Sequence, residues 1–298
     1  MKSARFRGLF PIVHTPFTPE GEVDFDSLRR LAVHVSSRSD GMVFPGFASE
    51  FWRLTDDEIS ACAGVIAGAG QGNTQVVLNV TSQATVPAIR SAEEFARMGA
   101  TALMLLPPFL VPSSAAAIES HLDALLAATS LPCIVQDSAG LTGMNFDPQS
   151  LARMKEKHSH FAAIKVDQVP TGPSISRYRA VPSLADLSYL VGYSGVQMLD
   201  AARRGATGLM GGCGHLDADR RMLDALLGDD AHSGFREFAR LAPLLNFEMQ
   251  SLDLVIHVHK HLLYEAGIIA TPVSRAPCRG MDSVHAEELR LHAAAVLS

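Results

Sequence analysis

One lysine stands out by its place in the sequence, because it continues a short apolar run. The run Phe161 to Ile164 is typical of a buried strand, Lys165 extends it, and Asp167 follows closely. Burial disfavours an ammonium group and lowers the pKa of a fully desolvated lysine by roughly 3–5 units. A neutral amine is a nucleophile that forms a Schiff base with a carbonyl compound. This stretch alone is equally compatible with a Lys165 side chain that reaches solvent.

The segments that must position Lys165 alternate between short apolar runs and stretches with helical periodicity. Continuous apolar strands separated by helices indicate parallel pairing, with the helices on the outside. Eight such units in about 210 residues predict a closed (β/α)8 barrel. The expected strands are residues 9–14, 41–45, 75–80, 101–106, 133–136, 161–165, 187–191 and 206–210.

A doubly wound sheet is the competing fold, and the C-terminal third of the chain has a different pattern. A doubly wound sheet requires a glycine-rich turn after the first strand, where this chain has His14-Thr15-Pro16-Phe17. Beyond residue 215 only helical periodicity remains, at 217–228, 234–246, 249–265 and 283–297. We therefore predict a barrel over residues 1–215 and a helical C-terminal extension over residues 216–298, packed on the barrel.

Composition excludes several classes of partner. The 298 residues carry a net charge of −6 without a basic stripe, so nucleic acid is not an expected partner. No apolar run approaches the roughly 20 residues that span a bilayer, so we expect no membrane insertion. The cysteines are far apart and form no CxxC pair, which indicates neither a zinc site nor a disulfide framework. A reducing cytosol suits them, and we expect a cytoplasmic protein.

In barrel enzymes the chemistry lies at the C-terminal ends of the strands. In this chain those ends, with a segment near the start of the chain and one at the start of the eighth strand, form a pattern that resembles the dihydrodipicolinate synthase / N-acetylneuraminate lyase family over nearly the whole length. The segments that carry the resemblance are Thr15-Pro16-Phe17, Gly46 to Glu50, Pro107-Pro108-Phe109, Thr142-Gly143, Ile164-Lys165 and Gly205-Ala206-Thr207-Gly208.

The resemblance implies a class I pyruvate-dependent aldolase or a sugar-acid dehydratase. Lys165 would then form the Schiff base with a 2-oxo acid, without a metal or another cofactor. The segment after the second strand would bind the carboxylate through backbone N–H groups. The family places this contact at Ala48 and Ser49, and the Ser49 hydroxyl could add a hydrogen bond. The family also implies a homo-oligomer, commonly a tetramer.

The resemblance is to a divergent member, because several hydroxyl groups of the family are missing together. Phe47 stands at a Thr or Ser position, Phe109 at a frequent Tyr position, and Gln136 at the position of the catalytic Tyr. Leu141 replaces an Arg found in members of the diaminopimelate pathway. These hydroxyl groups form a proton relay in those members, so the replacements argue against dihydrodipicolinate synthesis.

Another group must therefore move protons if the chain is an enzyme. Asp137 and Asp167 lie near the expected barrel mouth and could act as general acid or base. Gln136 cannot carry a proton near pH 7, but it could orient a water or a substrate hydroxyl. Asp137 is equally compatible with capping its loop. Glu50 is better explained as a structural residue of the Gly46–Glu50 loop.

The loops after the seventh and eighth strands are expected to face the distal end of a substrate. Tyr193, Ser194 and Gly212 are therefore candidate substrate-binding residues. Their glycine-rich sequences are better explained by tight turns with close backbone approach than by a phosphate site. Cys213 is interpreted as a packed, inert thiol. The run His257-Val-His-Lys-His261 has metal-compatible spacing, but a solvated or subunit-interface helix is the preferred interpretation.

The sequence thus predicts a Schiff-base-forming lyase acting on a small 2-oxo acid. Its reaction is either retro-aldol cleavage to pyruvate or dehydration of a 2-keto-3-deoxy sugar acid. A non-catalytic 2-oxo-acid sensor with the same fold is the main alternative, supported by the lost hydroxyl groups. A phosphate-binding barrel isomerase is a third, weaker one.

Overall fold

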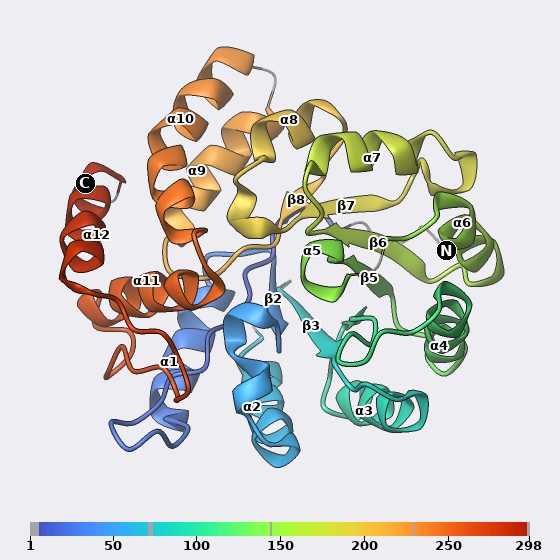
Figure 1. The fold of residues 1–298 in the computed structure, drawn as a ribbon, viewed down its shortest axis with the longest axis horizontal. Helices are drawn as coiled ribbons and strands as arrows, with labels where there is room; N and C mark the ends of the chain where they lie inside the picture. The colour runs from blue at the N-terminus through green and yellow to red at the C-terminus, as the bar shows by residue number, and fades with distance from the viewer. Residues whose placement is uncertain (1–5, 71–73, 144, 229, 297–298) are drawn as a thin grey trace.

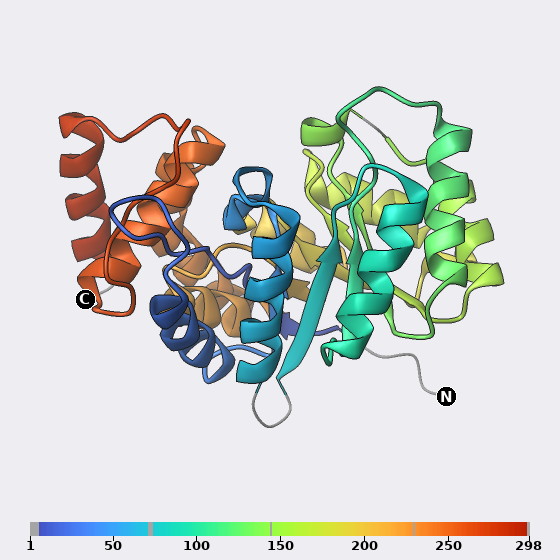
Figure 2. The same cartoon turned by 90° about the horizontal axis from the view of Figure 1, so that it is seen from below.

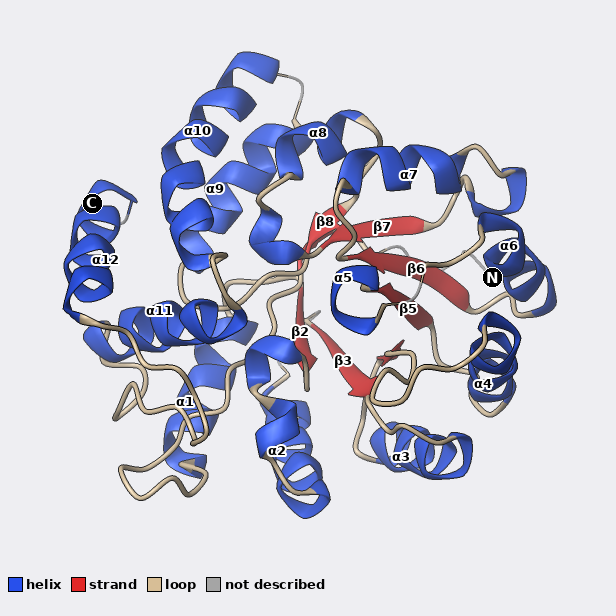
Figure 3. Cartoon of the chain, in the orientation of Figure 1, coloured by secondary structure: helices blue, strands red, loops and turns tan. Residues whose placement is uncertain are grey.

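Eight parallel strands surround a central axis, with helices on the outside (Figures 1 and 3). The computed structural model describes residues 6–70, 74–143, 145–228 and 230–296, apart from the side chains of Leu141 and Ala231. The strands pair in the order β1-β8-β7-β6-β5-β4-β3-β2, and a bridge between Ile12 and Val43 joins the two ends of this series. The predicted (β/α)8 barrel is confirmed.

The strands are short, as expected for a barrel of this size, and β1 and β8 are shorter than predicted. The strands are β1 (Gly8–Leu9), β2 (Gly41–Phe44), β3 (Gln75–Val80), β4 (Ala102–Leu105), β5 (Cys133–Asp137), β6 (Phe161–Val166), β7 (Ser188–Val191) and β8 (Gly208–Leu209). Beyond β1 the backbone still bonds to both neighbours, since the Ile12 N–H donates to Gly211 and the Val13 N–H to Val43. The register of β6 places Lys165 opposite Gln136 on β5 and Leu190 on β7.

The helices follow the strands in turn, and several of them are capped by local side chains. They are α1 (Phe25–Ser36), α2 (Asp56–Ala69), α3 (Thr85–Arg97), α4 (Ala115–Ala127), α5 (Ala139–Thr142), α6 (Pro148–Lys157), α7 (Thr171–Arg179), α8 (Met198–Arg203), α9 (Leu216–Leu227), α10 (Ala231–Glu248), α11 (Leu252–Glu265) and α12 (Ser283–Val296). Thr55 and Glu58 form a capping box at the start of α2. Asp24 caps α1, because its carboxylate accepts the N–H groups of Asp26 and Ser27.

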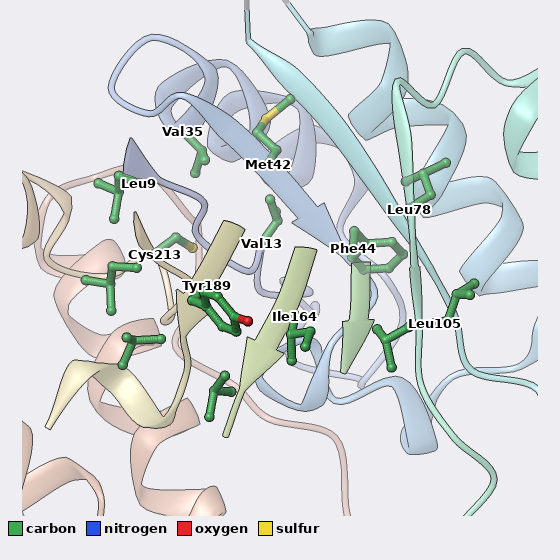
Figure 4. Close-up of a cluster of buried hydrophobic side chains, with 14 of the residues drawn as sticks. Leu9, Val13, Val35, Met42, Phe44, Leu78, Leu105, Ile164, Tyr189 and Cys213 are labelled. Atoms are coloured by element: carbon green, nitrogen blue, oxygen red, sulfur yellow. The ribbon is translucent and has the colours of Figure 1, made fainter. Parts of the chain in front are cut away.

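Two apolar layers follow from the alternation of side chains along each strand. One layer lies between strands and helices and includes Val13, Phe44, Ile164 and Tyr189 (Figure 4). The other fills the barrel interior, with Ile12, Val43, Val77, Met104, Ile134 and Ala163 among its members. Gln136 and Lys165 are two residues beyond Ile134 and Ala163, so their side chains face the interior as well.

The last helices lie to one side of the barrel (Figure 2). Helix α9 follows β8 and contacts β1, α8 and α10, while α12 packs on α10. The boundary at residues 215/216 stays a prediction. Among the described residues, no helix combines the length and the apolar character that crossing a membrane requires.

The interpretation of the histidine-rich helix as solvated or at a subunit interface is wrong for its central residues. On α11, His259 and Lys260 have no exposed surface and His257 is 8% exposed, all within a single chain. Helix α11 packs against the short 3-10 turn η1 (Phe47–Ser49) at the end of β2. His257 and His259 therefore lie in the interior of the molecule, at the C-terminal end of the barrel.

Candidate active site

Lys165 is buried at the C-terminal end of β6 and is paired with a carboxylate. Its side chain is 4% exposed, and its Nζ lies 3.0 Å from Oδ2 of Asp167. The Gln136 amide donates a hydrogen bond of 2.7 Å to the same oxygen. The ion pair offsets the cost of burying the ammonium group. The structure thus unites the predicted Lys165 and Gln136 with Asp167.

The loop after β7 approaches this pair through a glycine. A Cβ atom on Gly192 would lie 1.6 Å from Oδ1 of Asp167 and 3.2 Å from Cε of Lys165, so a side chain at this position would displace the carboxylate. The Tyr193 N–H donates a 3.2 Å hydrogen bond to Asp167 Oδ1. Tyr193 and Ser194 have positive φ values of 52° and 48°, in the left-handed region that non-glycine residues rarely adopt. Backbone strain of this kind is often held at functional sites.

Asp137 points to the other side of β5. Its Oδ2 accepts a 2.6 Å hydrogen bond from the Tyr178 hydroxyl on α7. Burial raises the pKa of Asp137 to about 6, the Tyr178 hydrogen bond acts against this, and the nearby Asp167 charge adds to it. Because Gln136 faces the interior, the next residue faces the helices. The structure brings Asp167, rather than the predicted catalytic Asp137, to Lys165.

The predicted carboxylate-binding loop is held by its own hydrogen bonds. The Ser49 hydroxyl donates to the Val13 carbonyl at 2.7 Å and accepts the Gly46 N–H at 3.0 Å. The Thr15 hydroxyl in turn donates to the Ser49 carbonyl at 2.7 Å. Ser49 therefore fixes the loop, and its hydroxyl is already engaged. Ala48 is buried among the apolar residues of the barrel interior.

Glu50 anchors the end of this loop through charge. Its φ is 60°, and its carboxylate pairs with Arg53 at 2.7 Å and with the buried Lys260 of α11. Burial lowers the pKa of Lys260 to about 8, and the Glu50 charge acts against this. These ion pairs fit the structural role expected for Glu50.

Phe47 and Phe109, two of the residues at which the resemblance implies hydroxyl groups, lie in a cluster of aromatic rings. The Phe47 ring lies 5.7 Å from Phe109, 5.4 Å from Phe51 and 6.2 Å from Trp52. The loops after β2 and β4 thus meet through apolar contacts. The side chain of Leu141, the fourth replaced position, lies outside the described residues.

A buried polar cluster at the C-terminal end of the barrel was missed by the sequence analysis. It joins His14 at the end of β1, His215 before α9, Glu248 on α10 and His259 on α11, all at most 3% exposed. The His259 ring lies 5.0 Å from His14 and 4.5 Å from His215. Only the spacing within α11 gave a signal, and it indicated His257 and His261 instead.

Hydrogen bonds define the proton positions in this cluster. The Gly214 N–H donates to Nδ1 of His259 at 2.6 Å, so the ring proton of His259 is on Nε2, 3.3 Å from Glu248 Oε2. His215 lies between the same Glu248 oxygen at 3.2 Å and Asp219 at 3.1 Å. Burial alone lowers the pKa of His215, but these two carboxylates outweigh it and raise the pKa well above its ordinary value.

The same cluster was tested as a metal site. One ligand atom each from His215, Glu248 and His259 lies within 4.8 Å of the others. A metal ion needs the lone pair of a ring nitrogen. In His259 the Gly214 N–H uses the lone pair of Nδ1, and Nε2 carries the proton. The donor set therefore fits a hydrogen-bonded network better than a metal.

The glycines after β8 explain how His259 fits. A Cβ atom on Gly212 would lie 2.6 Å from the His259 ring, and one on Gly214 would also lie 2.6 Å from it. Close backbone approach, as predicted for this loop, is thus what the glycines permit. Cys213 between them is buried, and burial raises the pKa of its thiol to about 12. The inert-thiol interpretation agrees with this placement.

Fold and site together define a (β/α)8 barrel with a buried lysine–aspartate pair at the end of its sixth strand. The chain belongs to the dihydrodipicolinate synthetase family, whose model matches residues 5–295. The family places the chain in a lyase-like group of enzymes.

Individual relatives are similar over most of the chain at low identity. A 4-hydroxy-tetrahydrodipicolinate synthase from Streptomyces coelicolor is 28% identical, with 94% of this chain and 92% of the relative covered. An L-2-keto-3-deoxyarabonate dehydratase from Azospirillum brasilense is 27% identical, with 92% and 87% covered. The solved dihydrodipicolinate synthase from Rhodopseudomonas palustris has a TM-score of 0.88 at 21% identity, covering 98% and 99% of the two chains. That likeness concerns the fold.

Proposed function

We propose that this chain is a class I lyase that forms a Schiff base between Lys165 and a 2-oxo acid. The observation that carries the proposal is the buried Lys165 Nζ, 3.0 Å from Asp167 inside the barrel mouth. A lysine held in a water-poor site beside a proton acceptor is suited to nucleophilic attack on a carbonyl.

Asp167 is the group placed to move protons during Schiff-base formation. It takes a proton from Nζ, the amine adds to the C2 carbonyl, and the carbinolamine hydroxyl leaves as water after receiving that proton. The resulting iminium accepts the electron pair of a C3–H or C3–C4 bond, which gives an enamine. Gln136, whose amide donates to Asp167 at 2.7 Å, keeps this carboxylate in place.

Two reactions remain as candidates, and neither is dihydrodipicolinate synthesis. Dehydration of a 2-keto-3-deoxy sugar acid removes a C3 proton and expels the C4 hydroxyl, whereas retro-aldol cleavage breaks C3–C4 and releases pyruvate. The similarity to the Azospirillum brasilense dehydratase supports the first. Phe47, Phe109 and Gln136 lack the hydroxyl groups of the synthase proton relay, which argues against the synthase reaction.

Borohydride trapping tests the Schiff base directly. The protein is incubated with pyruvate, reduced, digested and mapped by mass spectrometry, with Lys165→Ala as the test variant and Lys155→Ala as a control. A reduced adduct on Lys165 in the wild type and in the control, absent from Lys165→Ala, supports the proposal. Absence of an adduct with pyruvate and with larger 2-oxo acids overturns it.

A sensor of the same fold would bind a 2-oxo acid without turnover. The lost hydroxyl groups favour this second candidate. A lysine nucleophile beside a carboxylate disfavours it, since arginine suits carboxylate binding better. Exchange of the pyruvate methyl protons with deuterium, followed by NMR, distinguishes the two, because a sensor does not catalyse it. We also propose a cytoplasmic homo-oligomer, with a tetramer as the expected state.

A further inference from the structure

His14 faces the barrel interior at its C-terminal end. The backbone beyond β1 stays extended, with the Phe10 N–H bonded to Leu209 and the Ile12 N–H to Gly211. Phe10 and Ile12 belong to the apolar interior of the barrel, and side chains alternate along an extended chain. The next residue in this alternation is His14, which has no exposed surface.

Neither ring nitrogen of His14 has a hydrogen-bond partner among the described residues. Burial lowers the pKa of His14 well below its ordinary value, and His259 and Lys260 lower it further. The imidazole is therefore neutral and offers one N–H donor and one acceptor. The Ala48 backbone is close enough to affect this pKa, without a well-formed hydrogen bond. A buried donor without a partner is costly and calls for an explanation.

The protein groups behind His14 do not supply that partner. The His259 ring is 5.0 Å away, but Nδ1 of His259 accepts the Gly214 N–H, and its Nε2 faces Glu248 at 3.3 Å. Glu248 Oε2 in turn lies 3.2 Å from His215. This network fixes the position of the His14 ring from one side and leaves its nitrogens for another partner.

The neighbouring loop lacks a free side-chain donor for a carboxylate. Ala48 has none, and the Ser49 hydroxyl donates to Val13 at 2.7 Å. This bond to Val13 also keeps the loop beside His14. The interior of an eight-stranded barrel is just wide enough for side chains or one small ligand. The inward side chain of His14 beyond β1 and that of Lys165 on β6 both lie at the C-terminal end of this interior.

We propose that His14 is a substrate-binding residue whose imidazole N–H donates a hydrogen bond to the carboxylate of the 2-oxo acid held by Lys165. The inference rests on the proposed Schiff-base function and specifies which side chain binds the acid group. It also gives a partner to the buried imidazole. The carboxylate contact would then come from β1, in addition to the backbone of the Gly46–Glu50 loop.

The concentration dependence of pyruvate trapping on Lys165 tests the inference. His14→Leu removes the donor, and we expect the half-saturating pyruvate concentration to rise roughly 10- to 100-fold while the maximal adduct is unchanged. His14→Asn keeps an N–H donor, so the rise should be smaller. His121→Leu removes another buried histidine, on α4 and bonded to Thr85, and should trap like the wild type.

An unchanged half-saturating concentration in folded His14→Leu overturns the inference and leaves the Schiff-base proposal intact. No adduct in the wild-type protein overturns both. Thermal melting verifies that each variant folds. If His14→Leu does not fold, ¹⁵N-histidine NMR of the wild type replaces it: the His14 ring resonance, assigned with His14→Asn, should move when pyruvate is added. A resonance that does not move overturns the inference.

Discussion

Asp167 follows Lys165 by two residues, and both side chains lie on the inner side of the barrel. Lys165 Nζ and Asp167 Oδ2 are 3.0 Å apart, and the backbone of Gly192 and Tyr193 lies next to the Asp167 carboxylate. Asp137 shows the opposite case, since a hydrogen bond to Tyr178 holds it among the helices. At the residue scale, the face of the strand on which a carboxylate lies decides whether it contacts the lysine.

Gly192→Ala should slow Schiff-base formation. The added Cβ would lie 1.6 Å from Asp167 Oδ1, so the carboxylate must leave its present position beside Lys165. We expect the rate of borohydride-trapped adduct at saturating pyruvate to fall roughly 100-fold, as for loss of a general acid–base group. Gly211→Ala is the control, because its Cβ would meet Ser194 only at 3.5 Å. Equal rates for both variants would contradict the role of Asp167.

Asp137 should make the protein less stable as the pH rises. Its pKa is about 6 in the folded chain against 3.8 for the free group, so the folded state holds the proton more tightly. Its contribution to stability is therefore lost between about pH 4 and pH 6 and stays level above. The pKa difference corresponds to about 3 kcal/mol.

Asp137→Asn removes this titration and keeps an acceptor for Tyr178. From pH 4 to pH 6, the unfolding free energy of the variant should rise relative to that of the wild type. Urea unfolding at several pH values measures it. If the unfolding free energies of the two proteins change equally with pH, Asp137 is not the titrating group.

Helix α11 and the loop after β8 depend on each other at the scale of the elements. The His259 ring occupies the space left by the missing side chains of Gly212 and Gly214, and the Gly214 N–H bonds to it. Glu248 on α10 links this ring to His215 before α9. The C-terminal helices thus contact the segments that follow β1, β2 and β8 at the C-terminal end of the barrel, a contact that the division into barrel and extension does not express.

Glu248→Ala should destabilise the fold by about 3–5 kcal/mol, because it leaves the buried, protonated His215 with one carboxylate partner fewer. Glu248→Gln keeps the size and an acceptor and should cost less. Urea unfolding near pH 7 measures both. Glu237→Ala, whose side chain is 33% exposed, is the control and should change stability little. A loss below 1 kcal/mol for Glu248→Ala would show that the network contributes little to stability.

At the scale of the whole molecule, the surface carries apolar side chains near the mouth. Leu110 and Val111, between β4 and α4, are 75% and 72% exposed. Contiguous exposed apolar residues often mark contacts with another chain. In the proposed homo-oligomer, this segment would contact another copy of the chain.

Leu110→Asp combined with Val111→Asp should lower the mass of the assembly measured by light scattering after size-exclusion chromatography. Charges at a buried contact between copies are costly, so dissociation to smaller species is expected. Val33→Asp on α1, at a side chain that is 44% exposed, is the control. A wild-type protein that is monomeric would contradict the oligomer proposal itself.

The sequence by itself determined the barrel, its family and the lysine. Eight apolar runs separated by helical periods leave few other folds, and Lys165 ends one of these runs. Strand alternation also bears on the site, since Gln136 and Asp137 are consecutive and only one can face inward. The choice between them needed the register of β5 and β6.

Only the tertiary structure decided which polar groups lie together at the C-terminal end of the barrel. The polar cluster draws His14, His215, Glu248 and His259 from segments more than 200 residues apart at the extremes, and no spacing in the sequence links them. The engaged hydroxyl of Ser49 depends on its approach to the Val13 carbonyl. Buried polar groups are paired according to distance in space, because desolvation makes every unpaired one costly. Local sequence patterns determine on which face of a strand a side chain lies, whereas the packing of distant segments determines which groups it contacts there.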